Sequence, residues 1–298
     1  MKRNRNKIKN SYLGFTVVSS VVLSVFCLGI FFLLGWAFIS SLKIGNLTFA
    51  DNLFGLPKIN AKMFDNYVSV FNSFKITITS VTPTKDVYFF EMLGNSLLIA
   101  IGCSFSTIFA HAVMAYVCAK YSCKWTKFLY AVVIFTMIMP QLNTLAPMLL
   151  IVRGLHIYDT YIGMIIMKFT YLGTYFLILY ATFKGIAWDY AEAAFIDGAG
   201  NFTVFLKIML PMASATLGVL FVLQFIGYWN AYEFNLIYLP SMPTIAYGLY
   251  RFSVDASNNI TIPQQFAASI MLAIPMIALF IATKDKIMGS ISIGGLKG

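Results

Sequence analysis

One stretch, residues 185–211 (GIAWDYAEAAFIDGAGNFTVFLKIMLP), has the residue types and spacing of an element that docks onto another surface. Asp189 precedes YAEAAFID, and Glu192 follows three residues later, which is an aspartate version of the capping box. Gly198 can adopt the left-handed conformation that ends a helix. We therefore predict a helix of about eight residues, roughly 12 Å long.

A second helix is expected to follow directly. Asn201 can cap it and it runs to Pro211, so the chain makes a helix, a Gly-Ala-Gly elbow and a helix. The first helix combines small residues with two large apolar ones, namely Ala191, Ala193, Ala194, Phe195 and Ile196. A helix this short is marginal in water by itself, so it needs a surface to dock onto. Two interpretations of this segment stay open. It either docks onto a cytosolic partner protein or is an amphipathic elbow that lies on the lipid headgroups.

A few polar residues lie inside strongly apolar segments. Lys168 is one, and such a residue either lines a solute path or extends its long side chain to the membrane surface. Gln141 and Asn143 lie among prolines, where amides and freed carbonyls suit a hydroxyl-rich ligand, although helix packing explains them equally well. Trp229 and Asn230 offer a stacking face and a polar group, again with simple packing as the alternative.

The composition of the chain shows in which kind of protein these residues lie. Of 298 residues, 59% are hydrophobic and 11% charged, and the mean hydropathy is +0.79. Soluble domains have about 25% charged and 45–50% apolar residues, so this chain is an integral membrane protein. The net charge of +10 does not indicate nucleic acid, because basic residues flank membrane helices to set their orientation.

The sequence contains no constellation for catalysis. It has no P-loop, and its two histidines, His111 and His156, are too few and too far apart to build a metal site. His111 is expected to be a hydrogen-bonded interior residue. The four cysteines lie in or beside apolar segments without paired spacing, as small packing residues do. We predict no cofactor, no metal and no enzymatic activity of the chain's own.

Six stretches are long and apolar enough to span a bilayer. They are residues 14–41, 92–118, 127–151, 161–183, 210–238 and 264–283. With the amino terminus inside, 13 Lys and Arg residues lie on the inner side and 7 on the outer side, so both termini are expected to be cytoplasmic. The outer segment 42–90 contains KITITSVT and predicts a small strand-containing extension, whereas 239–263 predicts a polar outer loop.

The cytoplasmic segment resembles a known signature. Glu192-Ala193-Ala194, then Asp197-Gly198-Ala199, then Ile208-x-Leu210-Pro211 is similar to the EAA motif of permease subunits in bacterial ATP-binding-cassette importers. Segments 95–123, 137–163, 227–239 and 266–298 resemble the carbohydrate permeases, in particular the second membrane subunit of maltose-type importers. The likeness covers about residues 90–298; the tail SISIGG and the polar 42–90 loop depart from the family's pattern.

This resemblance implies an all-α membrane protein with six transmembrane helices, the type I importer permease fold, in two parts. Residues 1–90 would form the cytoplasmic N-terminus, first span and outer loop, and residues 91–298 the permease core. It further implies that residues 188–200 form a cytoplasmic coupling helix, seated in a groove of a separate ATPase subunit that hydrolyses ATP. Glu192 would then pair with a basic group of the ATPase. Ala193, Ala194 and Gly198 would keep the contact close, and Asp197 would cap or pair.

The resemblance also implies contacts elsewhere. The outer loop would enter the cleft of an extracytoplasmic solute-binding protein, with Tyr247, Gly248, Tyr250 and Arg251 as candidates; otherwise it is an ordinary connection. In the tail, 284–298, Gly294, Gly295 and Lys297 would insert between two ATPase subunits; otherwise the terminus is frayed. The partners implied are a second homologous permease subunit, an ATPase dimer and the binding protein, and the solute is a sugar or oligosaccharide.

Three rival functions remain open from the sequence. The first is a permease for another solute, such as a glycerol phosphate compound. The second is a self-contained secondary transporter, which would need paired intramembrane carboxylates or broken-helix repeats. The third is a membrane-embedded enzyme, for which no nucleophile–base or metal-ligand group can be assembled from the sequence.

Overall fold

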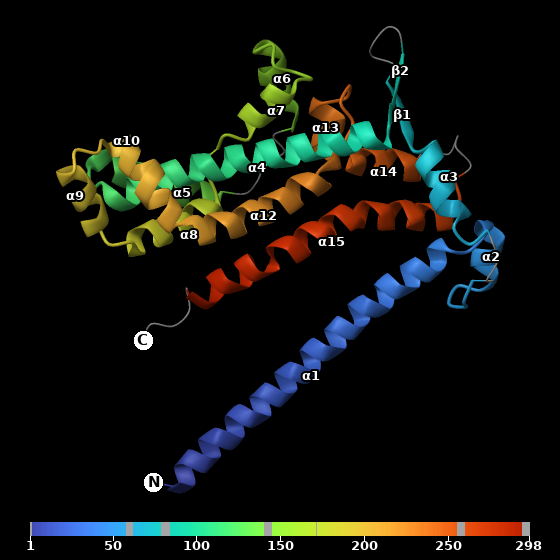
Figure 1. Ribbon diagram of the computed structural model, residues 1–298, viewed down its shortest axis with the longest axis horizontal. Coiled ribbons are helices and arrows are strands. Elements are labelled where there is room, and N and C mark those ends of the chain that lie inside the picture. The colour runs from blue at the N-terminus through green and yellow to red at the C-terminus, as the bar shows by residue number, and fades with distance from the viewer. Residues whose placement is uncertain are drawn as a thin grey trace. The chain divides into compact units, whose positions relative to one another are not determined.

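The computed structural model describes residues 2–57, 62–78, 84–139, 145–170, 172–254 and 260–293, which are helical apart from one hairpin and the connections (Figure 1). The helices in chain order are α1 (Lys2–Ser41), α2 (Gly45–Asp51), α3 (Asp65–Ser73), α4 (Phe89–Lys120), α5 (Lys124–Ile138), α6 (Leu145–Gly154), α7 (Tyr161–Met167), α8 (Thr174–Gly185), α9 (Asp189–Ile196), α10 (Asn201–Val204), the π-helix η1 (Phe205–Met209), α11 (Leu210–Met212), α12 (Ser214–Asn230), α13 (Tyr232–Tyr238), α14 (Ile245–Val254) and α15 (Ile262–Ile293). Strands β1 (Lys75–Ile78) and β2 (Lys85–Tyr88) pair antiparallel, with Lys75 opposite Tyr88. This hairpin confirms the predicted strand-containing extension.

The chain divides into two compact units. The first comprises residues 1–73 and 252–271, and the second comprises 74–251 and 272–298. In the first unit, polar contacts fix the end of α1: the Asn66 side-chain amide donates to the carbonyls of Ser41 and Lys43, each at 2.7 Å. Trp36 adds an edge contact to Phe266, with ring centroids 5.2 Å apart.

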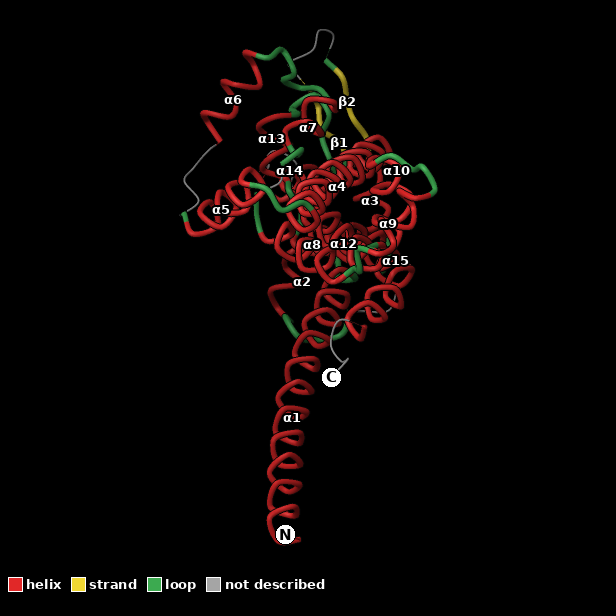
Figure 2. The backbone as a smooth tube through the Cα atoms, turned by 90° about the vertical axis from the view of Figure 1, so that its left-hand side faces the viewer, coloured by secondary structure: helices red, strands yellow, loops and turns green. Residues whose placement is uncertain are grey.

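In the second unit, α4 is the central helix, and α8 and α12 pack along it. Figure 2 looks nearly along α4 and shows both neighbours beside it. Figure 1 shows α5, α8, α9 and α10 at one end of α4, and α13, α14 and the hairpin at the other. A cluster of buried side chains joins the elements of the first of these ends, drawn from α4, α5, α8, α9, α10, η1, α12 and the turn before it. Its members are Ile108, Ala112, Ala115, Tyr116, Val133, Phe176, Leu179, Phe183, Ala191, Val204, Phe205, Met209, Ala213 and Leu220.

The chain bends sharply beside Pro211. Proline has no backbone N–H and its ring crowds the carbonyl four residues earlier, so it kinks or breaks a helix. The preceding turn widens to the π-helix Phe205–Met209, and Ala213 leaves the helical conformation. The segments Asn201–Met212 and Ser214–Asn230 consequently meet at 78°.

Among the described residues, three helical segments are long and apolar enough to cross a membrane: Gly14–Ser41, Phe89–Lys120 and Ile262–Lys284. They match the first, second and sixth predicted spans, and the bent pair at Pro211 matches the fifth if it counts as one span. The third predicted span consists of α5 and α6 on either side of residues 140–144, and the fourth consists of α7 and α8. The helical membrane fold is therefore confirmed, and the number of six spans stays a prediction.

The interruption of the fourth span has a local cause. Helix α7 ends at Met167, and Gly173 precedes α8 with a φ of +132°. An L-residue rarely adopts that conformation, and a helix cannot include it. The apolar run that suggested one continuous helix therefore forms two short ones.

Phe183 tests the buried cluster at the α9 end. Its side chain is fully buried, and its ring meets Tyr116 edge-on at 5.6 Å. We expect Phe183→Ala to lower the stability of the purified protein by about 3 kcal/mol or more, because it removes a ring and leaves a cavity. The matched control is Phe128→Ala on α5, where the side chain is 59% exposed. Thermal unfolding in detergent should separate the two variants; equal midpoints would show that the cluster does not hold this end together.

Candidate functional site

Helix α9, the predicted coupling helix, has the length and the carboxyl end that the sequence indicates. It spans eight residues, Asp189–Ile196, and Gly198 follows with a φ of +83°. The Gly198 N–H donates to the Phe195 carbonyl at 3.0 Å, and the Ala199 N–H donates to the Ala194 carbonyl at 2.9 Å. This pair of bonds is a Schellman motif, which satisfies carbonyls at the helix end.

The amino ends of α9 and α10 differ from the prediction. Trp188, not Asp189, is the N-cap of α9; its carbonyl accepts from Ala191 at 2.8 Å, and no side chain caps the helix. Trp188 already has a helical backbone conformation, so Asp189 lies inside the first turn and the predicted capping box is wrong. Asp189 and Glu192 there face the positive end of the helix dipole. Gly200 is the N-cap of α10, so the predicted cap at Asn201 is also wrong.

The inner face of α9 is fixed to the body of the unit. Ala191 is fully buried in the cluster, and Ala194 and Phe195 pack against it. The Trp188 ring meets Phe195 at 6.0 Å and Tyr121 at 5.9 Å. The small residues Ala191 and Ala194 thus pack inward against the chain itself, and the predicted contact of Ala193, Ala194 and Gly198 with an ATPase subunit stays a prediction.

Two hydrogen bonds hold the connections on either side of α9. The Lys120 ammonium group at the end of α4 donates to the Ile186 carbonyl, just before α9. The Tyr121 hydroxyl donates to the side-chain oxygen of Asn201, just after it, at 3.0 Å. Residues at the end of α4 thus form hydrogen bonds with the chain just before and just after α9.

The outer face of α9 is uncovered. Glu192, Ala193 and Asp197 are exposed, and neither carboxylate forms an ion pair with any residue that the structure describes. The contact predicted from the sequence consists of Glu192, Ala193, Ala194, Asp197 and Gly198. It does not include the two large side chains that the structure exposes on this face, Ile196 at 86% and Tyr190 at 53%. The spacing could have identified them, because Ala191, Ala194 and Phe195 share one helix face and leave Ile196 opposite.

Lys168 lies where α7 ends and α8 has not begun. Its ammonium nitrogen is 3.3 Å from the ring centroid of Phe234 and 5.6 Å from that of Tyr228, a cation–π arrangement. The Thr107 hydroxyl donates to the Lys168 carbonyl at 3.0 Å, which satisfies a backbone group at the break. This geometry favours an ammonium group that lies among aromatic rings over one that extends to the membrane surface. Contact with a solute stays a prediction.

The other residues predicted to line a solute path differ in their exposure. Trp229 is buried and stacks on Phe225 at 5.7 Å, which supports the packing interpretation. Asn230 is exposed and its amide donates to the Ile226 carbonyl at 2.9 Å. Gln141 and Asn143 lie outside the described residues. Away from this group, His111 is buried and its Nδ1 lies 2.7 Å from the Thr107 carbonyl, as predicted for an interior residue.

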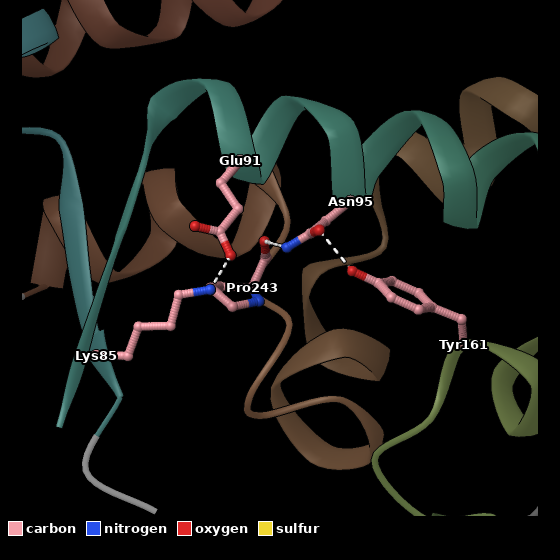
Figure 3. A network of polar contacts seen from close by, with 5 residues as sticks. All are labelled: Lys85, Glu91, Asn95, Tyr161 and Pro243. Carbon is pink, nitrogen blue, oxygen red and sulfur yellow. Dashed lines mark hydrogen bonds and ion pairs between the residues drawn. The ribbon is translucent and has the colours of Figure 1, made fainter. Parts of the chain in front are cut away.

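Hydrogen bonds attach the loop that precedes α14 to the start of α4 (Figure 3). The Asn95 amide nitrogen donates to the Pro243 carbonyl at 2.9 Å, and the Asn95 carbonyl oxygen accepts from the Tyr161 hydroxyl at 2.6 Å. One residue farther along, the Ser96 hydroxyl accepts from the Ile245 N–H at 2.8 Å. These bonds satisfy buried polar groups and fix the position of α14.

Helix α14 carries the four residues predicted to meet a binding protein, and they differ in exposure. Tyr247 is 7% exposed, and burial raises the pKa of its hydroxyl above the usual value. Gly248 is buried too, and a Cβ there would lie 2.8 Å from the Met92 sulfur, so both residues pack within the chain. Tyr250 is partly buried and stacks on Tyr232 at 4.6 Å, whereas Arg251 is exposed. The tail candidates Gly294, Gly295 and Lys297 lie outside the described residues.

The fold defines a multi-pass helical membrane protein that presents a short, capped helix with an apolar and acidic outer face. Residues 111–284, more than half of the chain, match the family described as the binding-protein-dependent transport system inner membrane component. The chain belongs to this family, and it is a permease component of an ATP-binding-cassette importer.

Relatives of known assignment agree with this. The chain is 28% identical over 245 residues to the arabinooligosaccharides transport system permease protein AraQ of Bacillus subtilis, covering 81% of each. It is 26% identical over 208 residues to the melibiose/raffinose/stachyose import permease protein MelC of the same species, covering 68% of this chain and 75% of MelC. It shares its fold with a chain in the crystal structure of a bacterial ABC transporter involved in the import of the acidic polysaccharide alginate. The TM-score is 0.69 at 22% identity, with 91% of this chain and 95% of that chain covered.

Gly198 and Gly200 give a matched test of the end of α9. A Cβ at either position meets open space, but Gly198 has a φ of +83° and Gly200 a φ of −78°. Gly198→Ala should destabilise the end of α9 by about 1–2 kcal/mol, because left-handed backbone is costly for an L-residue. Gly200→Ala should be close to neutral. Hydrogen exchange of the amides in 189–199 measures the difference, and equal exchange in both variants would contradict the cap.

Proposed function

We propose that this chain forms part of the translocation pathway of a sugar or oligosaccharide importer and that α9 couples it to a separate ATPase subunit. The observation that carries the proposal is the uncovered outer face of α9. Ile196 is 86% exposed beside Glu192 on a helix whose inner face is fixed. An exposed large apolar residue next to an unpaired charge is typical of a protein interface. The carbohydrate import named for AraQ and MelC supports a sugar as the solute.

The packing of α9 supports a lever role. A partner that moves α9 also displaces the cluster that Ala191 enters, and this cluster includes side chains of α4, α8 and α12. Dense packing transmits a displacement because no side chain can yield without creating a void. Closure of the ATPase would in this way change the arrangement of the helices beside the pathway.

The orientation and the remaining partners belong to the same proposal. The excess of Lys and Arg, 13 against 7, supports cytoplasmic termini and a cytoplasmic α9. A second, homologous permease subunit would complete the pathway, in which Lys168 and Asn230 are our candidates for solute contact, together with Gln141 and Asn143. The extracytoplasmic binding protein would deliver the solute to α14, and the tail, residues 284–298, would reach the ATPase through Gly294, Gly295 and Lys297.

Substitutions on the outer face of α9 test the coupling. Glu192→Lys should weaken association with the ATPase by on the order of 2 kcal/mol, about 30-fold, because it replaces an interface charge with its opposite. Ile196→Ser should reduce solute-stimulated ATP hydrolysis by removing an apolar anchor. Ile162→Ser on α7, where the side chain is 70% exposed, is the control for the loss of an exposed isoleucine.

The measurements are co-purification of the ATPase and ATP hydrolysis stimulated by solute-loaded binding protein in proteoliposomes. Membrane insertion and thermal stability should be unchanged in all three variants. Wild-type coupling in both α9 variants would refute the assignment of this helix.

Arg251 tests the outer contact. Among the four predicted residues of α14 it is the exposed one, and the structure gives Tyr247 and Gly248 packing roles. Arg251→Ala should lower the affinity for loaded binding protein by about tenfold, the effect of a typical interface arginine. The control is Arg153→Ala, which removes another exposed arginine from the predicted outer side. Titration of ATPase stimulation with binding protein measures both, and equal affinities would leave α14 an ordinary connection.

A further inference from the structure

A hollow of about 270 Å³ lies at the end of α4 where α5 begins and α8 ends. We name it the elbow pocket. Its lining includes the cations Lys120 and Lys127, the hydroxyls of Ser122 and Thr126, and the rings of Tyr130 and Tyr180. Pockets for drug-sized ligands measure about 300–1,000 Å³, so this one suits a compact polar group.

The charge of the elbow pocket is one-sided. Its lining contains no carboxylate, and Lys120 and Lys127 make no ion pair with any part of the chain that the structure describes. The Lys120 ammonium group donates a hydrogen bond to the Ile186 carbonyl. Because that carbonyl is neutral, the positive charge of Lys120 stays uncompensated. A third cation, Lys184, lies 5.7 Å from the ring centroid of Tyr180, one of the lining residues. The Thr126 hydroxyl already bonds the carbonyls of Tyr121 and Cys123, so Ser122 supplies the hydroxyl donor beside the lysines. Uncompensated cations next to a hydroxyl donor form a site for a phosphate group.

The surroundings of the pocket indicate where such a phosphate comes from. On α5, the same helix that supplies Lys127, Trp125 is 75% exposed and Phe128 is 59% exposed, and their rings lie 6.5 Å apart. Exposed aromatic side chains beside lysines mark the level of the lipid headgroups. Basic pockets between membrane helices on the cytoplasmic side bind anionic headgroups.

We propose that the elbow pocket binds the phosphate of an anionic phospholipid, with phosphatidylglycerol as the headgroup that fits its size and hydroxyl groups. The proposal rests on the proposed function for the cytoplasmic position of this end of α4. The headgroup bridges the start of α5, through Lys127, to Tyr180 and Lys184 of α8. Since α8 leads directly to α9, the lipid stabilises the elbow on which the predicted coupling helix depends.

Retention of lipid by the intact transporter tests this proposal. The complete complex is reconstituted in phosphatidylcholine with increasing phosphatidylglycerol, and the bound phosphatidylglycerol is measured by native mass spectrometry. We expect Lys127→Gln to weaken its retention about fivefold and Lys127→Gln with Lys184→Gln about 25-fold, because each basic residue at an anionic surface contributes about a factor of five. Lys120 is left intact because it holds the Ile186 carbonyl.

The control is Lys124→Gln. Lys124 is exposed on α5, one turn before Lys127, and does not line the pocket. Wild-type retention in this variant supports a specific site, whereas a loss equal to that of Lys127→Gln would show diffuse attraction and overturn the proposal. Displacement of the lipid by inorganic phosphate at millimolar concentration would overturn it in favour of a free-phosphate site.

The proposed function is tested by a separate measurement on the same samples. Solute uptake by the wild-type complex in phosphatidylglycerol-containing vesicles reports on the importer, and lipid retention reports on the pocket. A complex that retains the lipid but imports no sugar contradicts the proposed function alone. A complex that imports sugar and retains phosphatidylglycerol no better than phosphatidylcholine contradicts the elbow pocket alone.

Discussion

The packing of aromatic rings around Tyr116 is the interaction on which the rest of this end of the molecule depends. The Tyr116 ring lies 5.0 Å from Phe205 of η1, 5.6 Å from Phe183 of α8 and 5.9 Å from Tyr121. Helix α9 has only eight residues and no side-chain cap at its start, so it cannot be stable by itself. It exists because Ala191 enters the cluster that these rings build. Any force on α9 therefore also acts on the other elements of this cluster, which are α4, α5, α8, α10, η1 and α12.

The membrane adds a second constraint, which explains where the chain is irregular. Inside a bilayer, non-helical backbone is tolerated only where protein or water covers it. The bend at Pro211 follows this rule, since Met209 and Ala213 beside it are both fully or almost fully buried in the cluster. At the break after α7, the Lys168 carbonyl accepts a hydrogen bond from Thr107. The irregular points are thus covered by the helices they pack against, and they can be part of a membrane domain.

The features that could be predicted from the sequence are those set by a few neighbouring residues. The length of α9, the left-handed Gly198 and the strand at KITI all depend on local conformational preference, and the structure confirms them. The predicted N-cap of α9 at Asp189 is wrong. Trp188 packs on Tyr121, which is 67 residues away in the sequence, and this contact favours a helical backbone at position 188. The burial of Tyr247 likewise depends on partners that are distant in the sequence, which local residue preferences do not show.

The two ends of α4 are held by different kinds of interaction, and the difference has a mechanical consequence. Near the hairpin, directional hydrogen bonds from Asn95 and Ser96 fix the chain before α14 at one register. Near α9, most of the contact is close apolar packing, in which a side chain cannot move without moving its neighbours. A displacement that begins at α9 can therefore move α8, η1 and the adjoining end of α4 together, while the α14 end keeps its hydrogen bonds. Helix α4, continuous over 32 residues between these ends, is the element that can carry the displacement from one to the other.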